Sequence, residues 1–388
     1  MKIVDIREVA LPLQGQIANA VVNFAEHDVS LLALVTDVVR NGRPLVGLAF
    51  NSIGRFAQSG ILRHRLLPRL QRASPQSLLN DSGTQWDPAR VLACVLKNEK
   101  PGGHGDRAGA AAAIELAVWD LNAKLADEPA WATMARSCGR HVSLTPVDVY
   151  AAGGYYYAAG SGHSLGDELR RYRDMGYQAF KMKIGGASLP EDLRRIEEAL
   201  RVAGEGSRLA VDANGRFDLA TATAYARAMA GFGLRWFEEA GDPLDYDLNR
   251  AVAELGLSPV ATGENLFSCQ DVRNLVRFGG MRAGQDVFQM DPGLSYGLGE
   301  YLRMIEVLEQ AGYSRRQCYP HGGHLINLHI VAGLGLGGCE SYPGVFQPFG
   351  GYYPACRIEG STVMPPDAPG FGLELKPELS APLAQLLA

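Results

Sequence analysis

The sequence lacks three features that define familiar classes of protein: a long apolar run, a basic tract and closely paired cysteines. No window approaches about 18 uninterrupted apolar residues, so no transmembrane helix is expected. Lys and Arg form no tract and the formal net charge is −5, which argues against nucleic acid as a partner. The six cysteines show no CxxC pair and no framework spacing. They are therefore expected to be reduced thiols in a cytoplasmic protein.

The start of the chain, MKIVDIREVALPLQ, has acids inside its apolar stretch and no signal-peptide core. With 388 residues, of which 47% are hydrophobic, the chain can bury a large core and is expected to hold two domains. Strand-like segments up to about residue 50 precede helical segments, among them PARVLACVLKNEK and RAGAAAAIELAVWDLNAKLAD. Strands followed by helices predict an α+β module over residues 1–130.

From about Val147 the pattern changes to alternating strands and helices. Eight apolar segments read as strands, and amphipathic segments such as EDLRRIEEALRVAG lie between them. Polar residues stand at the end of nearly every such strand, which favours a parallel (β/α) barrel over an open sheet, where fewer strands feed the ligand site. We therefore predict an α/β fold with a barrel over residues 145–346. Residues 347–388, rich in Pro and Gly, are expected to pack back on the N-terminal module.

Three acids at the ends of successive predicted strands are equally spaced. Asp212, Glu238 and Glu264 are separated by 26 residues in both steps. One strand, loop, helix and return turn takes about 25–30 residues, so equal steps place the three carboxylates side by side on neighbouring parallel strands. Hard oxygen ligands in this arrangement suit Mg²⁺. A single acid of this kind would more often be a salt-bridged loop residue, but three in register predict a metal site.

The ordered motifs KMK (181–183), DANGRF, FEE, GEN, PHGGH and CES resemble those of the mandelate racemase group of the enolase superfamily. The resemblance implies a modified TIM-type (β/α)7β barrel, an α+β N-terminal capping domain with lid loops, and a homo-oligomer. It also implies Mg²⁺ chelated by a small hydroxy-acid substrate. More narrowly, NEKPGGHG, YAAGGYYY, LSYGL and ESYP are similar to segments of the D-tartrate dehydratases. One departure is Ala240, where family members commonly have proline after the Glu-Glu pair.

Two lysines and a histidine–aspartate pair are the predicted proton-transfer groups. Lys181 and Lys183 point to the same face of a strand, and repulsion with desolvation is expected to depress their pKa values so that one can act as a base. Asp291 and His321 end neighbouring strands, where the carboxylate can orient the imidazole and raise its pKa. The family pattern makes Lys183 the proton abstractor, with Lys181 supporting it, and places the His321–Asp291 pair on the opposite face of the substrate. Glu340 matches the family's electrophilic acid.

Five further residues are candidates for substrate binding. Asn214 lies two residues past Asp212 and could reach the metal or the substrate, although a turn role is about as plausible. The lid segments QIANAVVNF (16–24) and NSIGRF (51–56) and the loop before Pro101 supply Asn23, Asn51, Arg55 and Lys100, which could bind hydroxyls or a distal carboxylate. Solvated loop positions remain the alternative for each of these four.

His324 forms an HxxH pair with His321, and His329 could complete a zinc site. This spacing across a loop into a helix would not converge with the three acids, so zinc is rejected. The predicted function is a Mg²⁺-dependent dehydratase of a small hydroxy diacid or acid sugar, with D-tartrate converted to oxaloacetate. A racemase or epimerase that uses the same two bases is the first alternative. A non-catalytic acid-binding protein is the second.

Overall fold

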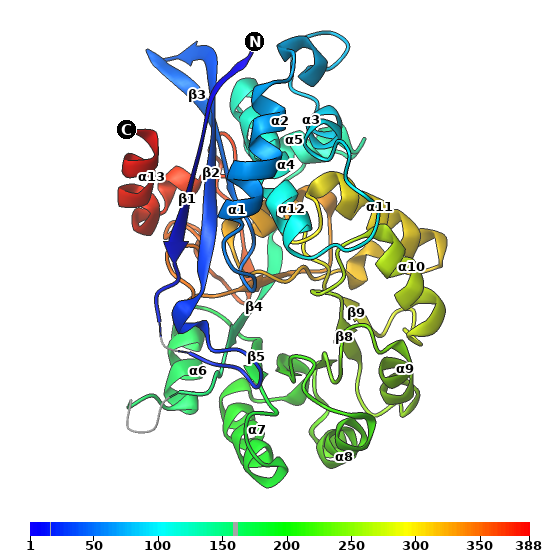
Figure 1. Cartoon of the computed structure of the whole chain (residues 1–388). Helices are drawn as coiled ribbons and strands as arrows, with labels where there is room; N and C mark the ends of the chain where they lie inside the picture. Colours follow the sequence, from blue (N-terminus) through cyan, green and yellow to red (C-terminus); the bar gives the residue numbers. More distant parts are fainter. Residues whose placement is uncertain (16, 158–161) are drawn as a thin grey trace.

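The computed structural model describes residues 1–15, 17–157 and 162–388, and it contains two separate sheets (Figure 1). Gln16, the first residue of one predicted lid segment, lies outside the described residues. A three-stranded antiparallel sheet lies in the N-terminal part, and an eight-stranded sheet of largely parallel strands follows. The predicted α/β barrel with an N-terminal α+β module is confirmed.

The N-terminal sheet consists of β1 (Ile3–Pro12), β2 (Asp28–Arg40) and β3 (Arg43–Phe50). β2 and β3 are joined by Asn41 and Gly42, whose φ angles of 52° and 75° fit the two-residue hairpin turn that this pair of residues favours. The sheet packs closely on a long helix, because a Cβ on Gly47 would lie only 2.3 Å from the Ala117 carbonyl oxygen.

A group of helices follows this sheet in the chain, and the longest of them packs against β2 and β3. Their bounds are α1 (Ser59–Ile61), a π-helical turn (Leu62–Leu66), α2 (Leu67–Gln71), α3 (Pro88–Val95), α4 (Asp106–Ala126) and α5 (Ala130–Ser137). The alanine-rich helix α4 is almost wholly buried, which small side chains on every face permit. Helix α3 is shorter than the predicted segment 88–100, since the chain leaves the helix after Val95 and Asn98 adopts a φ of 64°.

The second sheet forms the barrel. Its parallel strands are β4 (Val147–Gly153), β5 (Phe180–Lys183), β6 (Leu209–Asp212), β7 (Phe237–Glu238), β8 (Val260–Thr262), β9 (Val287–Phe288) and β10 (Cys339–Ser341). They pair in the order β10-β4-β5-β6-β7-β8-β9. Residues 318–321, predicted as the seventh strand, form only a bridge to β9, through Tyr319 N to Phe288 O (2.9 Å) and His321 N to Gln289 O (3.2 Å). This segment occupies the gap between β9 and β10.

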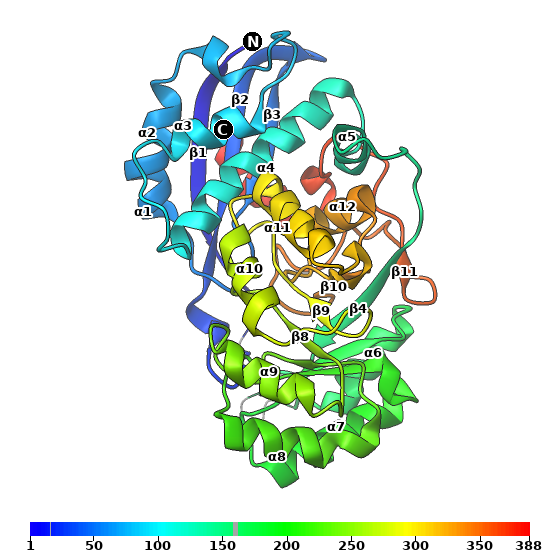
Figure 2. The ribbon, with the colours of Figure 1, turned by 90° about the vertical axis from the view of Figure 1, so that its right-hand side faces the viewer.

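In the part of the chain that the structure describes, seven α-helices alternate with these strands and surround them (Figure 2). They are α6 (Leu165–Asp174), α7 (Leu189–Ala203), α8 (Leu219–Met229), α9 (Tyr246–Glu254), α10 (Cys269–Phe278), α11 (Leu298–Gln310) and α12 (Leu325–Leu334). The alternation gives the expected (β/α)7β order. Because all the parallel strands run the same way, their carboxyl ends meet at one mouth of the barrel, where polar strand-end residues converge.

The C-terminal part returns to the N-terminal sheet. β11 (Thr362–Val363) pairs antiparallel with β4, and α13 (Ser380–Leu387) lies beside β1 (Figure 1). Arg7 donates a hydrogen bond to the Leu386 carbonyl, and Phe371 N donates one to Asp120 on α4. The boundaries at residues 130, 145 and 347 stay predictions. Among the described residues, no helix is both long and apolar enough to cross a membrane.

Candidate active site

Strand register brings the first residues of the site together. Lys183 on β5 pairs with Asp212 on β6, and Asp212 pairs with Glu238 on β7. Glu238 pairs with Ala261, so Glu264 lies in the loop beyond the end of β8. The ligand oxygens of Asp212, Glu238 and Glu264 nevertheless all lie within 4.8 Å of one another, which confirms the predicted carboxylate cluster. The equal sequence spacing therefore hides a geometric difference, because Glu264 reaches the cluster from a loop.

The chemistry of this cluster fits a hard divalent cation. Burial and the neighbouring Asp212 raise the pKa of Glu238. Burial would also raise the pKa of Asp212, but Lys183 and Lys181 outweigh it and lower the pKa to about 2. The buried Oε2 atom of Glu264 has no hydrogen-bond partner among the described residues. Three converging carboxylates with an unsatisfied oxygen could hold Mg²⁺, which prefers oxygen ligands.

The two lysines differ in their surroundings. Lys181 is fully buried, with Nζ 2.6 Å from Glu238 Oε1 and 2.7 Å from Glu340 Oε1. Lys183 Nζ lies 2.5 Å from Asp212 Oδ2, and its side chain lines the cavity described below. Of the two, Lys183 is therefore the one placed to meet a ligand.

The expected depression of the lysine pKa values is wrong for this arrangement. Burial alone would lower the pKa of Lys183, but the attraction of Asp212 outweighs it and raises the pKa above 10.5. The pKa of Lys181 is likewise raised, because Glu238 and Glu340 oppose the effect of burial. The sequence argument considered repulsion between the lysines and omitted the carboxylates that face them.

His321 and Asp291 form the predicted pair. His321 Nδ1 lies 3.1 Å from Asp291 Oδ2, while Nε2 lies 3.1 Å from the Tyr342 hydroxyl and 3.9 Å from Glu264 Oε2. Burial would lower the pKa of His321, but Glu264 and Asp291 outweigh it and raise the pKa to about 9. These carboxylates favour the protonated imidazole, whose Nε2 faces the Tyr342 hydroxyl on the cavity wall.

Glu340 on β10 lies next to Lys181 at the base of the site. Its Oε2 accepts a hydrogen bond from Gly322 N at 3.0 Å, and its side chain is fully buried. Burial would raise the pKa of Glu340, but Lys181 and His321 outweigh it and lower the pKa. This arrangement makes Glu340 a charge partner of Lys181, and its role as an electrophilic acid stays a prediction.

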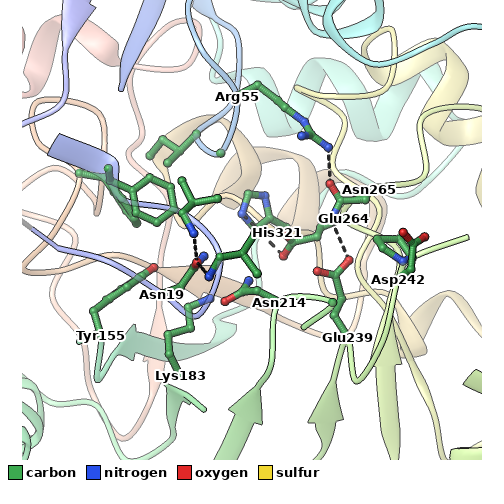
Figure 3. Close-up of a pocket in the computed structure, with 18 of the residues that line it drawn as sticks. Asn19, Arg55, Tyr155, Lys183, Asn214, Glu239, Asp242, Glu264, Asn265 and His321 are labelled. Carbon is green, nitrogen blue, oxygen red and sulfur yellow. Dashed lines mark hydrogen bonds and ion pairs between the residues drawn. The ribbon is translucent and has the colours of Figure 1, made fainter. Parts of the chain in front are cut away.

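A cavity of about 450 Å³ opens at the barrel mouth (Figure 3). Lys183, Asn214, Glu264 and His321 line it from the barrel side. The N-terminal domain covers it with two loops, which contribute Asn19, Val21, Val22, Phe24, Ile53, Gly54 and Arg55. The two lid segments predicted from the sequence therefore both border the site.

Of the five predicted substrate-binding residues, two line the cavity and three do not. Arg55 and Asn214 line the cavity. Asn214 also adopts a φ of 48° and donates its backbone N–H to Asp212, so it serves the turn as well. Asn23 instead accepts from Ala25 N, and the buried Asn51 accepts from Ser30 N at 2.7 Å. Lys100 is exposed and lies outside the set of lining residues.

The three histidines considered for zinc do not converge. His324 Nδ1 accepts from Asn327 N at 3.4 Å, and His329 Nδ1 accepts from Trp131 N at 3.3 Å. Within the part of the chain that the structure describes, the carboxylate triad is the one group of three or more potential metal ligands. The rejection of zinc is consistent with this geometry.

Several lining residues were not singled out from the sequence. Asn265 and Glu239 are joined by a 2.8 Å hydrogen bond, and Arg55 donates to Asn265 on its other side (Figure 3). Tyr155 and Tyr342 complete the wall near Lys183 and His321. Each of these four residues lies just after the end of a predicted strand, so closeness to a strand end is the sequence feature that could have identified them. Ser52 lies inside the lid segment NSIGRF, and nothing in the sequence distinguishes it from its neighbours.

Comparison with known proteins agrees with this architecture. The L-talarate/galactarate dehydratase of Salmonella typhimurium is 26% identical over 332 residues, which cover 84% of this chain and 77% of that protein. The arabinonate dehydratase of Saccharolobus solfataricus is 27% identical over 273 residues, covering 68% and 69% of the two chains. The crystal structure of L-talarate dehydratase from Polaromonas sp. JS666, complexed with Mg and L-glucarate, superposes with a TM-score of 0.74. That pair is 21% identical, with 97% and 95% of the chains covered.

A racemase from Streptomyces coelicolor with bound magnesium has the same fold, with a TM-score of 0.75 and 21% identity over 98% of each chain. The fold thus occurs in proteins named for dehydration and for racemisation. Residues 164–379, more than half of the chain, match the family described as enolase C-terminal domain-like. With the barrel, the carboxylate triad and this match in place, the chain belongs to the enolase superfamily.

Proposed function

We propose that this protein is a Mg²⁺-dependent dehydratase of a small hydroxy diacid or acid sugar, with D-tartrate as the first substrate to test. The observation that supports it most is the placement of two different proton-transfer groups in one cavity. Lys183 precedes the carboxylate triad in strand order, and His321 follows it. Dehydration needs such a pair, because a proton is removed at one carbon and the hydroxyl of the next carbon must be protonated.

The metal and the lysine act together in this proposal. Mg²⁺ held by Asp212, Glu238 and Glu264 would offset their attraction on Lys183 and would acidify the proton beside a bound substrate carboxylate. Lys183 then takes the C2 proton on Nζ, and the electron pair left behind is first held by the substrate carboxylate as an enediolate, from which it forms the C2–C3 double bond. The C3–O bond breaks as His321 gives its Nε2 proton to the departing hydroxyl, which leaves as water. The enol product tautomerises to a 2-keto acid, which is oxaloacetate when the substrate is D-tartrate.

The cavity also offers a partner for a second carboxylate. Arg55 enters from the N-terminal domain and is held by Asn265, the residue after the metal ligand Glu264. Its guanidinium lies 5.4 Å from the centre of the Phe267 ring. Arg55, Lys183 and His321 are the basic residues among the described lining residues, and Lys183 and His321 have roles in the chemistry. We therefore assign the distal carboxylate of a diacid to Arg55, and not to the exposed Lys100.

The test is a panel of tartrate isomers, six-carbon diacids and matching monoacids, incubated with enzyme and Mg²⁺ in deuterated water. The expected result is a 2-keto acid from at least one diacid, with faster turnover than the monoacid of equal length. A racemase would instead return labelled substrate of inverted configuration. If every acid is recovered without exchange or product, the proposal is wrong.

A further inference from the structure

A buried polar cluster lies behind His321, where the N-terminal domain meets the barrel. Ser52 follows β3 and has no exposed surface. Its Oγ lies 2.5 Å from Asp291 Oδ2, the oxygen that also faces His321 Nδ1, and 3.0 Å from His324 Nε2. Neither Ser52 nor His324 belongs to the carboxylate triad or lines the cavity. The proton-transfer steps described above leave both residues without a role.

The direction of each hydrogen bond in this cluster follows from its partners. The backbone N–H of Asn327 can only donate, so His324 Nδ1 is the acceptor of that bond. Burial lowers the pKa of His324 to about 4, so near neutral pH the ring is uncharged and carries its single proton on Nε2. That N–H donates to Ser52 Oγ. The serine hydroxyl is then free to donate its own proton to Asp291 Oδ2.

The space around the serine is small. A Cβ on Gly322 would lie 2.7 Å from Ser52 Oγ and 2.8 Å from Asp291 Oδ2. A Cβ on Gly293 would lie 2.8 Å from Ser52 Cβ. Two glycines therefore leave room for the hydroxyl and little more. This packing restricts the serine and the carboxylate to the arrangement seen here.

We propose that His324 and Ser52 are positioning residues, which hold Asp291 through the chain His324 Nε2–H to Ser52 Oγ–H to Asp291 Oδ2. Held in this way, the carboxylate fixes the His321 ring with Nδ1 toward Asp291 and Nε2 toward the cavity. The inference rests on the proposed function only where it concerns the step that His321 carries out.

The position of Ser52 links this arrangement to the lid. Ser52 shares its loop with Gly54 and Arg55, which line the cavity. A Cβ on Gly54 would lie 3.4 Å from His321 Cε1, so the loop also covers the edge of the imidazole. This loop of the N-terminal domain therefore adds its own contacts to those that the barrel makes with Asp291 and His321.

The kinetic test compares Ser52→Ala with Ser30→Ala in deuterated water. Ser30 is the matched control, because it is also buried in the N-terminal domain and its Oγ accepts from Gln58 N. Ser52→Ala is expected to lower kcat for dehydration by about 10- to 100-fold, with KM and exchange of the C2 proton changed by less than about twofold. Ser30→Ala is expected to leave the ratio of exchange to dehydration unchanged. Equal loss of exchange and dehydration in Ser52→Ala, or no loss of either, would overturn the proposal.

A second measurement does not depend on turnover. In protein labelled with ¹⁵N-histidine, NMR at pH 7 is expected to show His324 uncharged with its proton on Nε2. The His321 signals are expected to shift in Ser52→Ala, but not in Ser30→Ala. A His324 proton on Nδ1 would contradict the relay. If no acid is turned over but these signals behave as expected, the proposed function fails and the positioning relay stands.

Discussion

At the scale of single residues, Lys183 and Lys181 face carboxylates, and this decides their charge. Asp212 holds the pKa of Lys183 above its usual value, and Glu238 does the same for Lys181. A lysine in this state is a poor base, because the proton that it must accept is already bound. In the proposed reaction, Lys183 can therefore act as a base only once positive charge lies among these carboxylates. In this proposal, the protonation state of Lys183 therefore depends on whether the metal is bound.

The triad makes a prediction about metal binding that requires no substrate. Mg²⁺ is expected to raise the melting temperature of the wild-type protein by several degrees at about 100 times its Kd, where binding stabilises the fold by about 2.7 kcal/mol. Glu264→Gln is expected to lose most of this shift. Glu264 is the suitable position, because within the described residues its Oε2 has no hydrogen-bond partner that the substitution would remove. Thermal denaturation with and without Mg²⁺ measures the effect.

The matched control for this experiment is Glu197→Gln, which changes an exposed glutamate on α7 that does not belong to the carboxylate triad. It should show the full wild-type shift. If Glu264→Gln also shows the full shift, the cation binds elsewhere, and the assignment of the triad fails.

The sequence predicted the triad correctly, because strand periodicity and equal spacing are properties of the backbone. The charge state of the lysines was not predictable in the same way, since its sign depends on which side chains lie within about 3 Å. The sequence also could not show which of two neighbouring residues in a loop contacts the site. In NSIGRF the sequence drew attention to Asn51, whose amide bonds within its own domain, while the adjacent Ser52 contacts Asp291 across the domain interface.

At the scale of elements, helix α4 supplies the N-terminal cap of helix α11. The N-cap residue of α11 is Gly297, which has no side chain to bind the free backbone N–H groups. Glu115 on α4 takes this role, accepting from Leu298 N at 2.9 Å and Gly299 N at 3.1 Å. A Cβ on Gly297 would lie 2.2 Å from Glu115 Oε2, so the glycine makes the contact possible.

This cap predicts a pH-dependent stability. Burial raises the pKa of Glu115 to about 7, against which its hydrogen bonds act only in part. Because the pKa of Glu115 is higher in the folded than in the unfolded state, the folded protein binds the proton more tightly. The stabilisation from this difference is complete below about pH 4.5 and is lost as the pH rises through 7. Between pH 5 and pH 8 the wild type is therefore expected to lose about 3 kcal/mol relative to Glu115→Gln. Melting temperatures of both proteins at the two pH values test this.

Glu115→Gln also places an amide N–H against a backbone donor, which lowers its stability by an amount that does not vary with pH. The test therefore compares the difference in stability between wild type and Glu115→Gln at pH 5 with the same difference at pH 8. The sign of that difference at a single pH decides nothing. The control Glu197→Gln should differ from wild type by the same amount at both pH values. A difference for Glu115→Gln that is equal at pH 5 and pH 8 would rule out ionisation of this buried carboxyl.

The order of elements was predictable, and their lengths were not. Eight strand-like segments with helices between them predicted an alternating barrel, and the family resemblance implied its (β/α)7β form. However, β7 and β9 contain two residues each, and residues 318–321 form only a bridge. Apolar periodicity marks buried residues, and burial in this barrel extends well beyond the regular hydrogen-bond ladder. The helical sequence pattern likewise continues beyond the end of α3, where Asn98 adopts a positive φ that a helix does not allow.

At the scale of the whole molecule, the site is shared between the N-terminal domain and the barrel. The barrel brings the triad, Lys183 and His321, which can remove and deliver protons. The N-terminal domain brings Arg55 to the cavity and Ser52 to Asp291. The loop of residues 51–56 therefore carries both a residue of the cavity wall and a contact to the partner of His321. Proteins of this fold can share the barrel chemistry and differ in reaction through such loops.

The central claim is that Lys183 removes the C2 proton and that His321 then completes dehydration. The most direct measurement is ¹H NMR of a turned-over diacid in deuterated water with Mg²⁺, using wild type, Lys183→Ala and His321→Asn. Lys183→Ala is expected to lose exchange and dehydration together, by at least about 10²-fold. His321→Asn is expected to keep C2 exchange while dehydration falls by at least about 10²-fold. Exchange at the wild-type rate in Lys183→Ala, or dehydration at the wild-type rate in His321→Asn, would contradict the account.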